Sequence, residues 1–388
     1  MADPDKPQEK KELSMEVRMA IAFGLMLLVL LGSPYFYKLV MPTPPPGAEK
    51  KAPANTSQPA AKSPPAAAKP PAPNVAAAAT PEPAAPTAAA AEQKETIETD
   101  LFKVTFSNRG GVVESWILKK FTVSCTTRPL ELVNSEAAPV TGFPLSLWFK
   151  TQKPSSDVNQ ALYTVKRAPD NLGIDFEFSS GKTTVRKKIR FTRNTYLLDL
   201  STEVTEMGAP LPHEITWRGG FGDMAVPSAA ASQHTIYYDE AASKLVVYSV
   251  SDAKNGPLAE SGLYSFAGLE DTYFAAVFLP HPNTTIGIVT LSEAVPSPAT
   301  KQTEPHIGAA VGGDGRNQLS LFVGPKDIDI LRAINPKLEQ VVDFGYVGFL
   351  AKPLFLVVRW VNDHWVHNYG WSIILVTIFI NFALLPLK

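Results

Sequence analysis

A run of seventeen residues without a charged side chain, from Trp371 to Leu387, constrains the fold of this chain more than any other feature. It is at the short limit of a helix that crosses the hydrocarbon core of a bilayer, which takes about 20 residues. A second uncharged run, from Met19 to Tyr37, ends in aromatic side chains where an interfacial belt would lie. We therefore expect transmembrane helices over residues 19–40 and 370–388.

The first apolar run has two interpretations, an uncleaved anchor and a cleaved signal peptide. No small-x-small site closes the run, and Pro34 and the aromatic residues stand where cleavage would be expected. These features favour the anchor. Lys and Arg flank the run on both sides, and their distribution favours a cytoplasmic N-terminus, which places residues 1–18 in the cytoplasm.

Proline is concentrated in the segment that follows. Fourteen of the 35 prolines lie between Pro42 and Pro86, and residues 41–95 contain almost no large apolar side chain. Such a composition buries too little surface to offset the entropy of ordering, and proline stiffens it towards polyproline II. We expect a disordered linker; a ligand for a proline-recognition module is the alternative.

A period-two pattern of apolar residues extends over residues 96–324, and turn signals such as "NRGG" and "PDNLG" interrupt it. In "TTVRKKIRFT", for example, Val185, Ile189 and Phe191 alternate with Arg186, Lys188 and Arg190. Many short strands with few helical windows predict a single large antiparallel β-sandwich. The basic face of this strand is either a solvated surface or a binding patch.

The sequence shows no pattern of catalytic or metal-binding residues. The six histidines fit no Ser/His/Asp or His-x-x-x-His arrangement, and the glycine-rich pieces "WRGGFGD" and "VGGDG" do not fit a phosphate loop. A balance of 36 basic against 37 acidic residues gives no footprint for nucleic acid. The single cysteine, Cys125, excludes an intramolecular disulfide, and we expect it to be buried. We expect no enzymatic activity, metal or cofactor.

Residues 325–369 change to a helical pattern. "GPKDIDILRAINPKL" predicts a short helix with Pro325 in its first turn and its end at Asn335. An amphipathic helix follows, bent at Pro353, with Lys352, Arg359, Asp363 and His367 opposite its apolar side. The apolar side consists of Val347, Leu350, Leu354, Val357, Val358, Val361 and Trp365. Next to an apolar span, this helix is expected to lie in the membrane interface; against a soluble core it would be an ordinary amphipathic helix.

A polar side chain, Asn381, interrupts the last apolar run. At 100° per residue, Thr377, Asn381 and Lys388 lie within about 40° of one another on a helix. A carboxamide in a membrane span costs free energy unless it has a partner or faces water. The two hypotheses are that this face lines a hydrophilic groove, or that Asn381 bonds a neighbouring helix.

Several motifs near the C-terminus resemble the YidC family of bacterial membrane protein insertases. They are "FVGPKDIDIL", "VVDFGYVGFLAKPLF" and "NYGWSIILVTIFINFALLPLK", and "SNRGGVVESWILKKF" and "DTYFAAVFLP" are similar to landmarks of the family's periplasmic domain. The resemblance implies a mainly β periplasmic domain, a β-supersandwich like that of sugar mutarotases. It also implies transmembrane helices, an interfacial amphipathic helix and a multi-pass protein of the bacterial inner membrane.

The resemblance further implies partners and a site. The partners would be nascent membrane proteins, the lipid bilayer and components of the Sec translocon, and the site would be a hydrophilic groove. The family usually carries Arg or Lys at the position of Asn381, so the neutral amide here is a departure that removes a charge. The sequence stops at the close of the groove's first span, so we expect an N-terminal portion of an insertase.

Two hypotheses from other classes remain open. The chain could be a membrane-anchored periplasmic carbohydrate-binding or mutarotase-like protein, which predicts a cluster of His and carboxylate side chains in one cleft. It could also be a scaffold whose β domain only docks partners.

Overall fold

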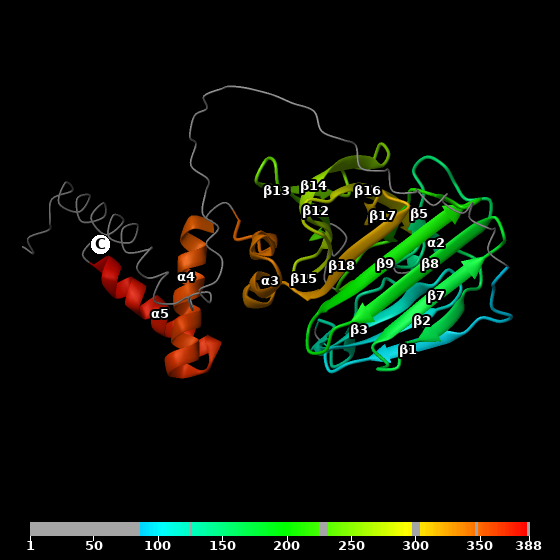
Figure 1. The fold of residues 1–388 in the computed structure, drawn as a ribbon. Coiled ribbons are helices and arrows are strands. Elements are labelled where there is room, and N and C mark those ends of the chain that lie inside the picture. The colour runs from blue at the N-terminus through cyan, green and yellow to red at the C-terminus, as the bar shows by residue number, and fades with distance from the viewer. Residues whose placement is uncertain (1–85, 125, 226–231, 297–302, 346–347, 386–388) are drawn as a thin grey trace, which may run out of the picture. The chain divides into compact units, whose positions relative to one another are not determined.

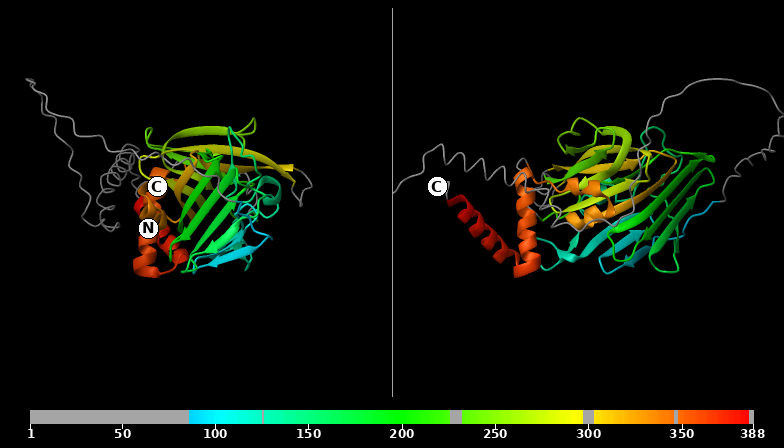
Figure 2. Two further views of the ribbon diagram at one scale, coloured as in Figure 1. Left: turned by 45° about the vertical axis from the view of Figure 1, so that its right-hand side comes forward. Right: turned by 60° about the vertical axis from the view of Figure 1, so that its left-hand side comes forward.

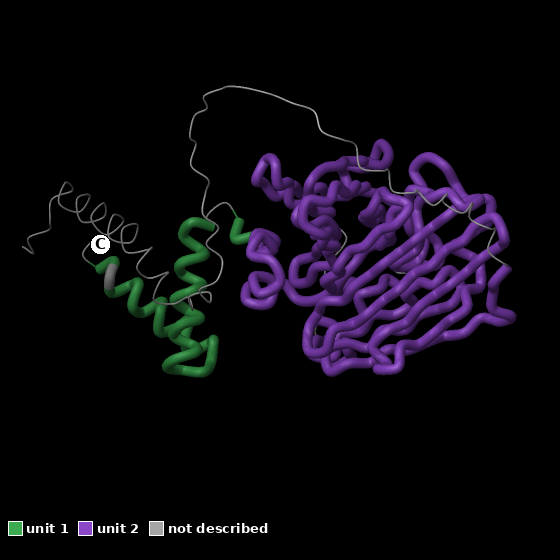
Figure 3. The backbone as a smooth tube through the Cα atoms, in the orientation of Figure 1, with its two compact units in different colours: residues 1–74, 343–388 green, residues 75–342 purple. Residues whose placement is uncertain are grey.

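The computed structural model describes residues 86–124, 126–225, 232–296, 303–345 and 348–385. The predicted first span, most of the proline-rich linker, Cys125 and Lys388 lie outside the described residues. The chain divides into two compact units, residues 75–342 and residues 1–74 with 343–388 (Figure 3). We call their described parts the β unit and the helical unit. Most described residues belong to the β unit, so the mainly β prediction is confirmed.

The β unit consists of short strands that pair with one another in antiparallel orientation throughout its described residues (Figure 1). The strands are β1 (Lys94–Glu98), β2 (Phe102–Ser107), β3 (Val112–Thr122), β4 (Pro129–Glu131), β5 (Leu147–Trp148), β6 (Thr164–Arg167), β7 (Gly173–Ser179), β8 (Thr183–Phe191), β9 (Leu197–Glu206), β10 (Ala209–Pro210), β11 (Glu214–Trp217), β12 (His234–Asp239), β13 (Lys244–Ser249), β14 (Leu258–Glu270), β15 (Phe274–Pro280), β16 (Thr285–Pro296), β17 (Thr303–Gly312) and β18 (Arg316–Pro325). The helices of this unit are α2 (Ala138–Thr141), α3 (Ile328–Ile334) and the 3₁₀ helix η2 (Pro336–Val341).

The strands form a four-stranded sheet, β1-β2-β3-β4, and a long sheet with the order β5-β11-β17-β16-β14-β15-β18-β9-β8-β7-β6. Strand β14 belongs to three ladders, because its first half pairs with β16 and its second half pairs with both β15 and β12. A Cβ at Gly268, in the second half, would collide with the backbone carbonyl of Ala276 on β15. The long sheet therefore changes layer at β14, and the two further views show the layered sandwich that results (Figure 2).

One core joins the two sheets. The alternation in β2 buries Phe102, Val104 and Phe106, as the sequence pattern predicts. Phe102 packs against Phe191 of β8 with ring centroids 5.2 Å apart, and Trp116 of β3 packs against Trp217 of β11 at 5.8 Å. Aromatic pairs of this kind add to the free energy gained from burial. The small sheet is thus held to the long sheet by aromatic side chains.

Lys187 is fully buried in this core. Its ammonium donates hydrogen bonds to the backbone carbonyls of Gly110 (2.7 Å), Gly111 (3.1 Å) and Leu145 (2.7 Å). Gly110 and Gly111 both have positive φ, at 75° and 56°, which glycine adopts without strain. Burial lowers the pKa of Lys187 to about 7, while the three carbonyls favour the charged form. The predicted turn "NRGG" is therefore fixed to β8 by a lysine.

Helix α3 begins later than the sequence predicts. Pro325 pairs with Phe274 as the last residue of β18, so it does not enter the first helical turn. Asp327 caps the helix instead, because its carboxylate accepts hydrogen bonds from the backbone N–H of Asp329 (2.9 Å) and Ile330 (3.3 Å). The predicted end at Asn335 is confirmed.

The helical unit contains α4 (Gly348–Val361), the single-turn π-helix η3 (Asn362–Val366) and α5 (Tyr369–Leu384). Pro353 lies inside α4, and His367, with φ of 53°, separates η3 from α5. The side chain of Asn368 caps α5 by accepting from the N–H of Trp371 at 3.3 Å. Helices α4 and α5 pack against each other. In the described part of the chain, no helix has both the length and the apolar composition needed to cross a bilayer.

Candidate functional site

The predicted polar face of the last helix lies on α5. The hydroxyl of Thr377 donates to the carbonyl of Ile373 at 2.7 Å, and Nδ2 of Asn381 donates to the carbonyl of Thr377 at 2.9 Å. Both side chains are exposed, and neither hydrogen-bonds another helix within the described residues. Each donor is thus satisfied by its own helix. The third member of the predicted face, Lys388, is outside the described residues.

The remaining surface of α5 is apolar. Phe379 and Phe382 expose 69% and 68% of their areas, and large apolar side chains are exposed on most of the circumference. Among the side chains of this helix that the structure describes, Ser372 and Val376 are buried. At 100° per residue these two lie about 180° and 140° away from Asn381. The polar pair Thr377 and Asn381 therefore lies opposite the packed side of α5.

The predicted interfacial residues of α4 do not share one environment. Leu350 and Leu354 are exposed, Val357 and Val358 are half-buried, and Val361 is buried. Leu356, which is not part of the predicted apolar side, is buried as well. The packing of α4 against α5 explains this difference in burial, because a helix in a helical hairpin buries part of its apolar surface. Val347 lies outside the described residues.

The turn after α4 carries the last predicted interfacial residue, Trp365. The α-helix ends at Val361 and a π-turn follows, so Trp365 does not continue the wheel of α4. Trp360 stacks on His364 with ring centroids 5.2 Å apart and contacts Trp365 at 5.4 Å. Trp365 and Trp371 are exposed. Aromatic side chains thus gather around the turn between α4 and α5.

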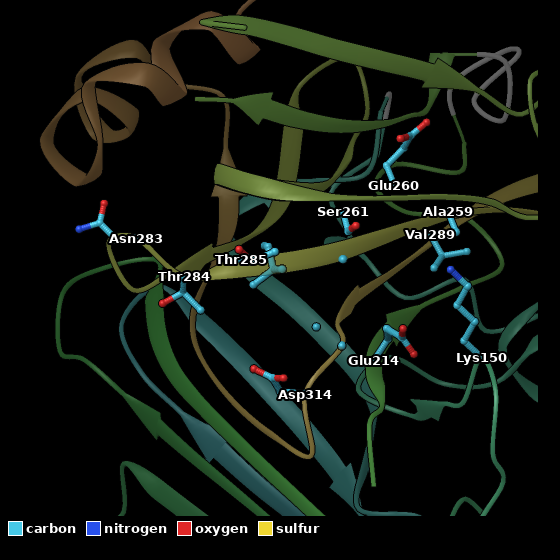
Figure 4. A pocket seen from close by; sticks show the side chains of 14 residues that line it. Lys150, Glu214, Ala259, Glu260, Ser261, Asn283, Thr284, Thr285, Val289 and Asp314 are labelled. Carbon is cyan, nitrogen blue, oxygen red and sulfur yellow. The ribbon is translucent and has the colours of Figure 1, made fainter. Parts of the chain in front are cut away.

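The β unit contains a cavity of about 560 Å³ at the end of β11 and β17 (Figure 4). Its lining residues are Lys150, Glu214, Ala259, Glu260, Ser261, Asn283, Thr284, Thr285, Ile286, Gly287, Val289, Gly312, Gly313 and Asp314. Glu214 is 7% exposed, and its Oε2 atom has no hydrogen-bond partner among the described residues. Burial raises the pKa of Glu214 to about 6, an effect that the charge of Lys150 partly opposes.

The cavity lacks the cluster that a mutarotase-like enzyme would need. No histidine is among the described residues that line it. His213, beside Glu214 in sequence, bonds Thr202 (Nε2 to Oγ1, 2.8 Å) and the carbonyl of Leu211 (from Nδ1, 3.0 Å), and burial lowers its pKa to about 4. It is a hydrogen-bonded core residue. Among the described residues, no three His, Cys, Asp or Glu side chains come together as they would around a metal ion.

Several buried charged groups of the β unit, among them Lys187 and Glu214, were not predicted from the sequence. The alternation in β8 contains a signal for Lys187, because this residue lies between Val185 and Ile189 on the inward side. For Glu214 there is no such signal, since both faces of β11 are buried.

Comparison with known proteins gives the family. The model of the YidC periplasmic domain matches residues 94–357. The membrane protein insertase YidC of Syntrophus aciditrophicus is 30% identical over 395 residues, which cover 96% of this chain and 70% of that protein. The insertase of Geotalea daltonii is 27% identical over 383 residues, 96% of this chain and 69% of its own length.

Two solved structures are similar in part. A galactose mutarotase related enzyme from Lactobacillus acidophilus has a TM-score of 0.38 and 11% identity, over 60% of this chain and 97% of that chain. YidC from Thermotoga maritima has a TM-score of 0.30 and 12% identity, and the match covers 78% of this chain and 71% of that chain. Both scores are below 0.5, so the assignment depends on the family model, which covers more than half of the chain, and on the 30% identical relative. By these two matches, the chain belongs to the YidC family of membrane protein insertases.

Proposed function

We propose that this protein is a membrane protein insertase that assists the insertion and folding of inner-membrane proteins. Family membership supports the proposal, and the surface of α5 is the structural observation that carries it. Helix α5 exposes the apolar side chains of Phe379 and Phe382, and it carries a polar stripe at Thr377 and Asn381. Such a surface fits a helix that contacts lipid on one side and a water-filled groove on the other.

The proposed arrangement in the membrane follows from the same surfaces. Residues 19–40 and 370–388 cross the inner membrane, residues 1–18 are cytoplasmic, and residues 96–324 form the periplasmic domain after a linker. Helix α4 lies in the outer interface, where its exposed Leu350 and Leu354 would contact acyl chains. The aromatic turn around Trp360 and Trp365 suits the same depth.

The proposed mechanism needs no catalytic group. A polar stripe with access to water lowers the cost of moving a hydrophilic segment through the hydrocarbon core. The apolar segment of the substrate supplies the driving force by partitioning into lipid. Asn381 contributes hydrogen bonding without charge: its Nδ2 bonds its own helix, and its Oδ1 has no described partner and can accept from water or a substrate backbone.

The proposed partners follow from this mechanism. Nascent membrane proteins would occupy the groove that Thr377, Asn381 and Lys388 line, and lipid would surround the apolar faces. The β unit would serve as a platform for partners, with components of the Sec translocon as our candidates.

Thiol accessibility tests the placement of the polar stripe. The protein, as its gene encodes it, is expressed with Cys125→Ser and either Asn381→Cys or Phe379→Cys. Position 379 lies about 160° from position 381 on the helix and is also exposed, so it is a matched control. We expect a membrane-impermeant maleimide to label position 381 in intact membranes, and position 379 only after detergent is added. Equal labelling at the two positions would refute the stripe.

Insertion itself is tested by replacing the insertase of a host cell with this protein. Protease protection of a single-span substrate reports insertion. We expect Asn381→Leu to reduce insertion several-fold, whereas deletion of residues 96–324 leaves most of the activity. The opposite result, activity lost with the β unit and unchanged by Asn381→Leu, would favour a β domain that acts by itself.

A further inference from the structure

Strand β13 is an edge strand, because β12 is its only partner among the described strands. Its outer backbone groups can be located from Ser249 at its end. The N–H of Ser249 donates to Oδ2 of Asp252 at 2.7 Å, and its carbonyl accepts from the N–H of Asp252 at 3.1 Å, so both groups point away from β12. Residues of an antiparallel pair face the partner and the outside alternately. The N–H and C=O of Leu245 and Val247 therefore also point outward, and no described residue bonds them.

Other edges of the β unit are protected against pairing. Nδ2 of Asn159 donates to the carbonyl of Leu147 on β5 at 2.8 Å, and its Oδ1 accepts from the N–H of the same residue at 2.9 Å. The guanidinium of Arg167 donates to the carbonyl of Thr96 on β1. Proline, bulges and several charges are the usual protections of an edge. Strand β13 has one charge, Lys244, and neither a proline nor a shift of register against β12. Its edge is therefore open to a further strand.

The same edge of a second copy of the chain matches this one. Antiparallel pairing about a twofold axis at Val246 places Leu245 opposite Val247 of the other copy, and these two pairs exchange four hydrogen bonds. Shifting the axis by one residue along the strand places an outward residue opposite Ser249, whose groups are already bonded, or opposite Ser243, whose φ of 50° is not extended. The register at Val246 alone satisfies all the open groups.

The charges near the edge are complementary in this register. Lys244 is exposed and would lie opposite Tyr248 of the second copy. The hydroxyl of Tyr248 donates to Oε1 of Glu260 at 3.4 Å, and Glu260 is exposed. The ammonium of each copy would thus pass the Tyr248 ring and approach the Glu260 carboxylate of the other. The twofold axis repeats this contact at both ends of the paired strands, and Val246 meets its own copy between them.

We propose that β13 pairs with β13 of a second copy of this chain, in antiparallel register about Val246. The pairing joins two β units into a dimer through one continuous sheet. Two six-residue strands form a small contact compared with the roughly 1,200–2,000 Å² of a standard interface, so the dimer is weak in free solution. Confinement of both copies to one membrane, which rests on the proposed function, raises their effective concentration. The dimer is therefore expected in membranes.

Disulfide cross-linking of the full protein in membranes tests the proposal. In a Cys125→Ser background, Val246→Cys places two thiols at the axis, where the Cα atoms of a non-hydrogen-bonded pair are about 4.5 Å apart, a separation that a disulfide spans. We expect oxidation to convert most of this variant to a covalent dimer. Val165→Cys, at a half-buried position of the edge strand β6, is the matched control and should stay monomeric. Equal dimer in both variants, no dimer of Val246→Cys, or its cross-linking to a different polypeptide would overturn the proposal.

Substitutions at the edge test the hydrogen bonds. In the Val246→Cys protein, Val247→Pro removes an outward N–H and no hydrogen bond to β12, so we expect cross-linking to fall at least fivefold. Val247→Ala keeps the N–H and should retain most of the cross-linking. Thermal unfolding of both variants checks that the β unit stays folded. Equal cross-linking in the two folded variants would overturn the pairing.

Charge reversal tests the register. In the Val246→Cys protein, Lys244→Glu places a carboxylate beside Glu260 of the other copy, and we expect cross-linking to slow about threefold. Adding Glu260→Lys restores the opposite charges and should restore the rate. No recovery in this double reversal would overturn the register. Resistance to alkaline extraction reports the membrane anchor and protease protection reports insertion, so a failure of the proposed function is distinguished from a failure to dimerise.

Discussion

The β unit and the helical unit differ in where their polar and apolar side chains lie. In the β unit, large apolar side chains such as Trp116 are buried, and the enclosed Lys187 makes three hydrogen bonds. In the helical unit, Phe379 and Phe382 are exposed, whereas the donors of Thr377 and Asn381 bond their own helix. Water around the β unit explains the first pattern, and lipid around α5 would explain the second.

A polar group is costly for a different reason in each unit. In the β unit the cost comes from leaving an enclosed group without a partner, so single buried residues such as Lys187 and Glu214 have large effects. On α5 the cost would come from any new charge on the outer surface, so exposed positions matter.

The largest effect is expected from Lys187→Met. The change leaves the carbonyls of Gly110, Gly111 and Leu145 without their donor, and each unsatisfied buried acceptor costs roughly 1–3 kcal/mol. We expect the free energy of unfolding to fall by at least about 3 kcal/mol. Urea unfolding followed by the fluorescence of the core tryptophans measures it. The exposed neighbour Lys188→Met is the control, and an equal loss in both variants would contradict the account.

A charge on the surface of α5 is expected to have the next largest effect. Phe379→Lys should cost about 2.5–3.5 kcal/mol of membrane integration if this helix lies in lipid. Val247→Lys, at a 45% exposed position of β13, should change stability by less than about 0.5 kcal/mol. The fraction of protein that resists alkaline extraction from membranes measures integration. If Phe379→Lys integrates as well as the parent protein, the contrast between the two units is wrong.

Glu214→Gln is expected to stabilise the β unit. Burial raises the pKa of Glu214 from an ordinary 4.5 to about 6, so the folded protein favours the protonated form. The stability of the parent protein therefore falls as the pH rises from about 4.5 to 6 and stays lower above it. The cost of ionisation is about 2 kcal/mol. Thermal unfolding should show the variant more stable at pH 7.5 and equal to the parent at pH 4; a variant that is less stable at pH 7.5 would mean that Glu214 has a partner.

The smallest effect is expected for the stability of Asn381→Leu. Because Nδ2 of Asn381 donates to Thr377 on the same helix, its loss breaks no contact between helices of the described residues. The free energy that holds α4 and α5 together should change by less than about 1 kcal/mol. Unfolding of the protein in mixed micelles by a denaturing detergent measures it. A loss of several kcal/mol would restore the hypothesis that Asn381 bonds a neighbouring helix.

Much of the sandwich could be predicted because side chains alternate along a strand. The inward side of β2 at Phe102, Val104 and Phe106 follows from period two alone. The start of α3 could not be predicted in the same way, since Pro325 fits either a first helical turn or the end of a strand. Its pairing with Phe274, fifty-one positions away, decides between them.

The candidate site was only partly predictable. The shared face of Thr377 and Asn381 follows from the 100° step of a helix. The π-turn that moves Trp365 off the wheel of α4 has no clear sequence signal. Glu214 becomes buried only when β5 and β17 pair on either side of β11, and these contacts between distant segments are not visible in a local pattern.

The position of β18 has a consequence for the timing of synthesis. This strand lies between β15 and β9 and is the link that joins the two halves of the long sheet (Figure 1). It is also the last of the described strands in chain order, so it is the last of them to become available for pairing. Until then the two part-sheets have open edges at β9 and β15, which can pair with other chains. A chain that ends before Arg316 would therefore expose two unpaired strand edges, at β9 and β15. In a chain that continues past Pro325, β18 would pair with both edges.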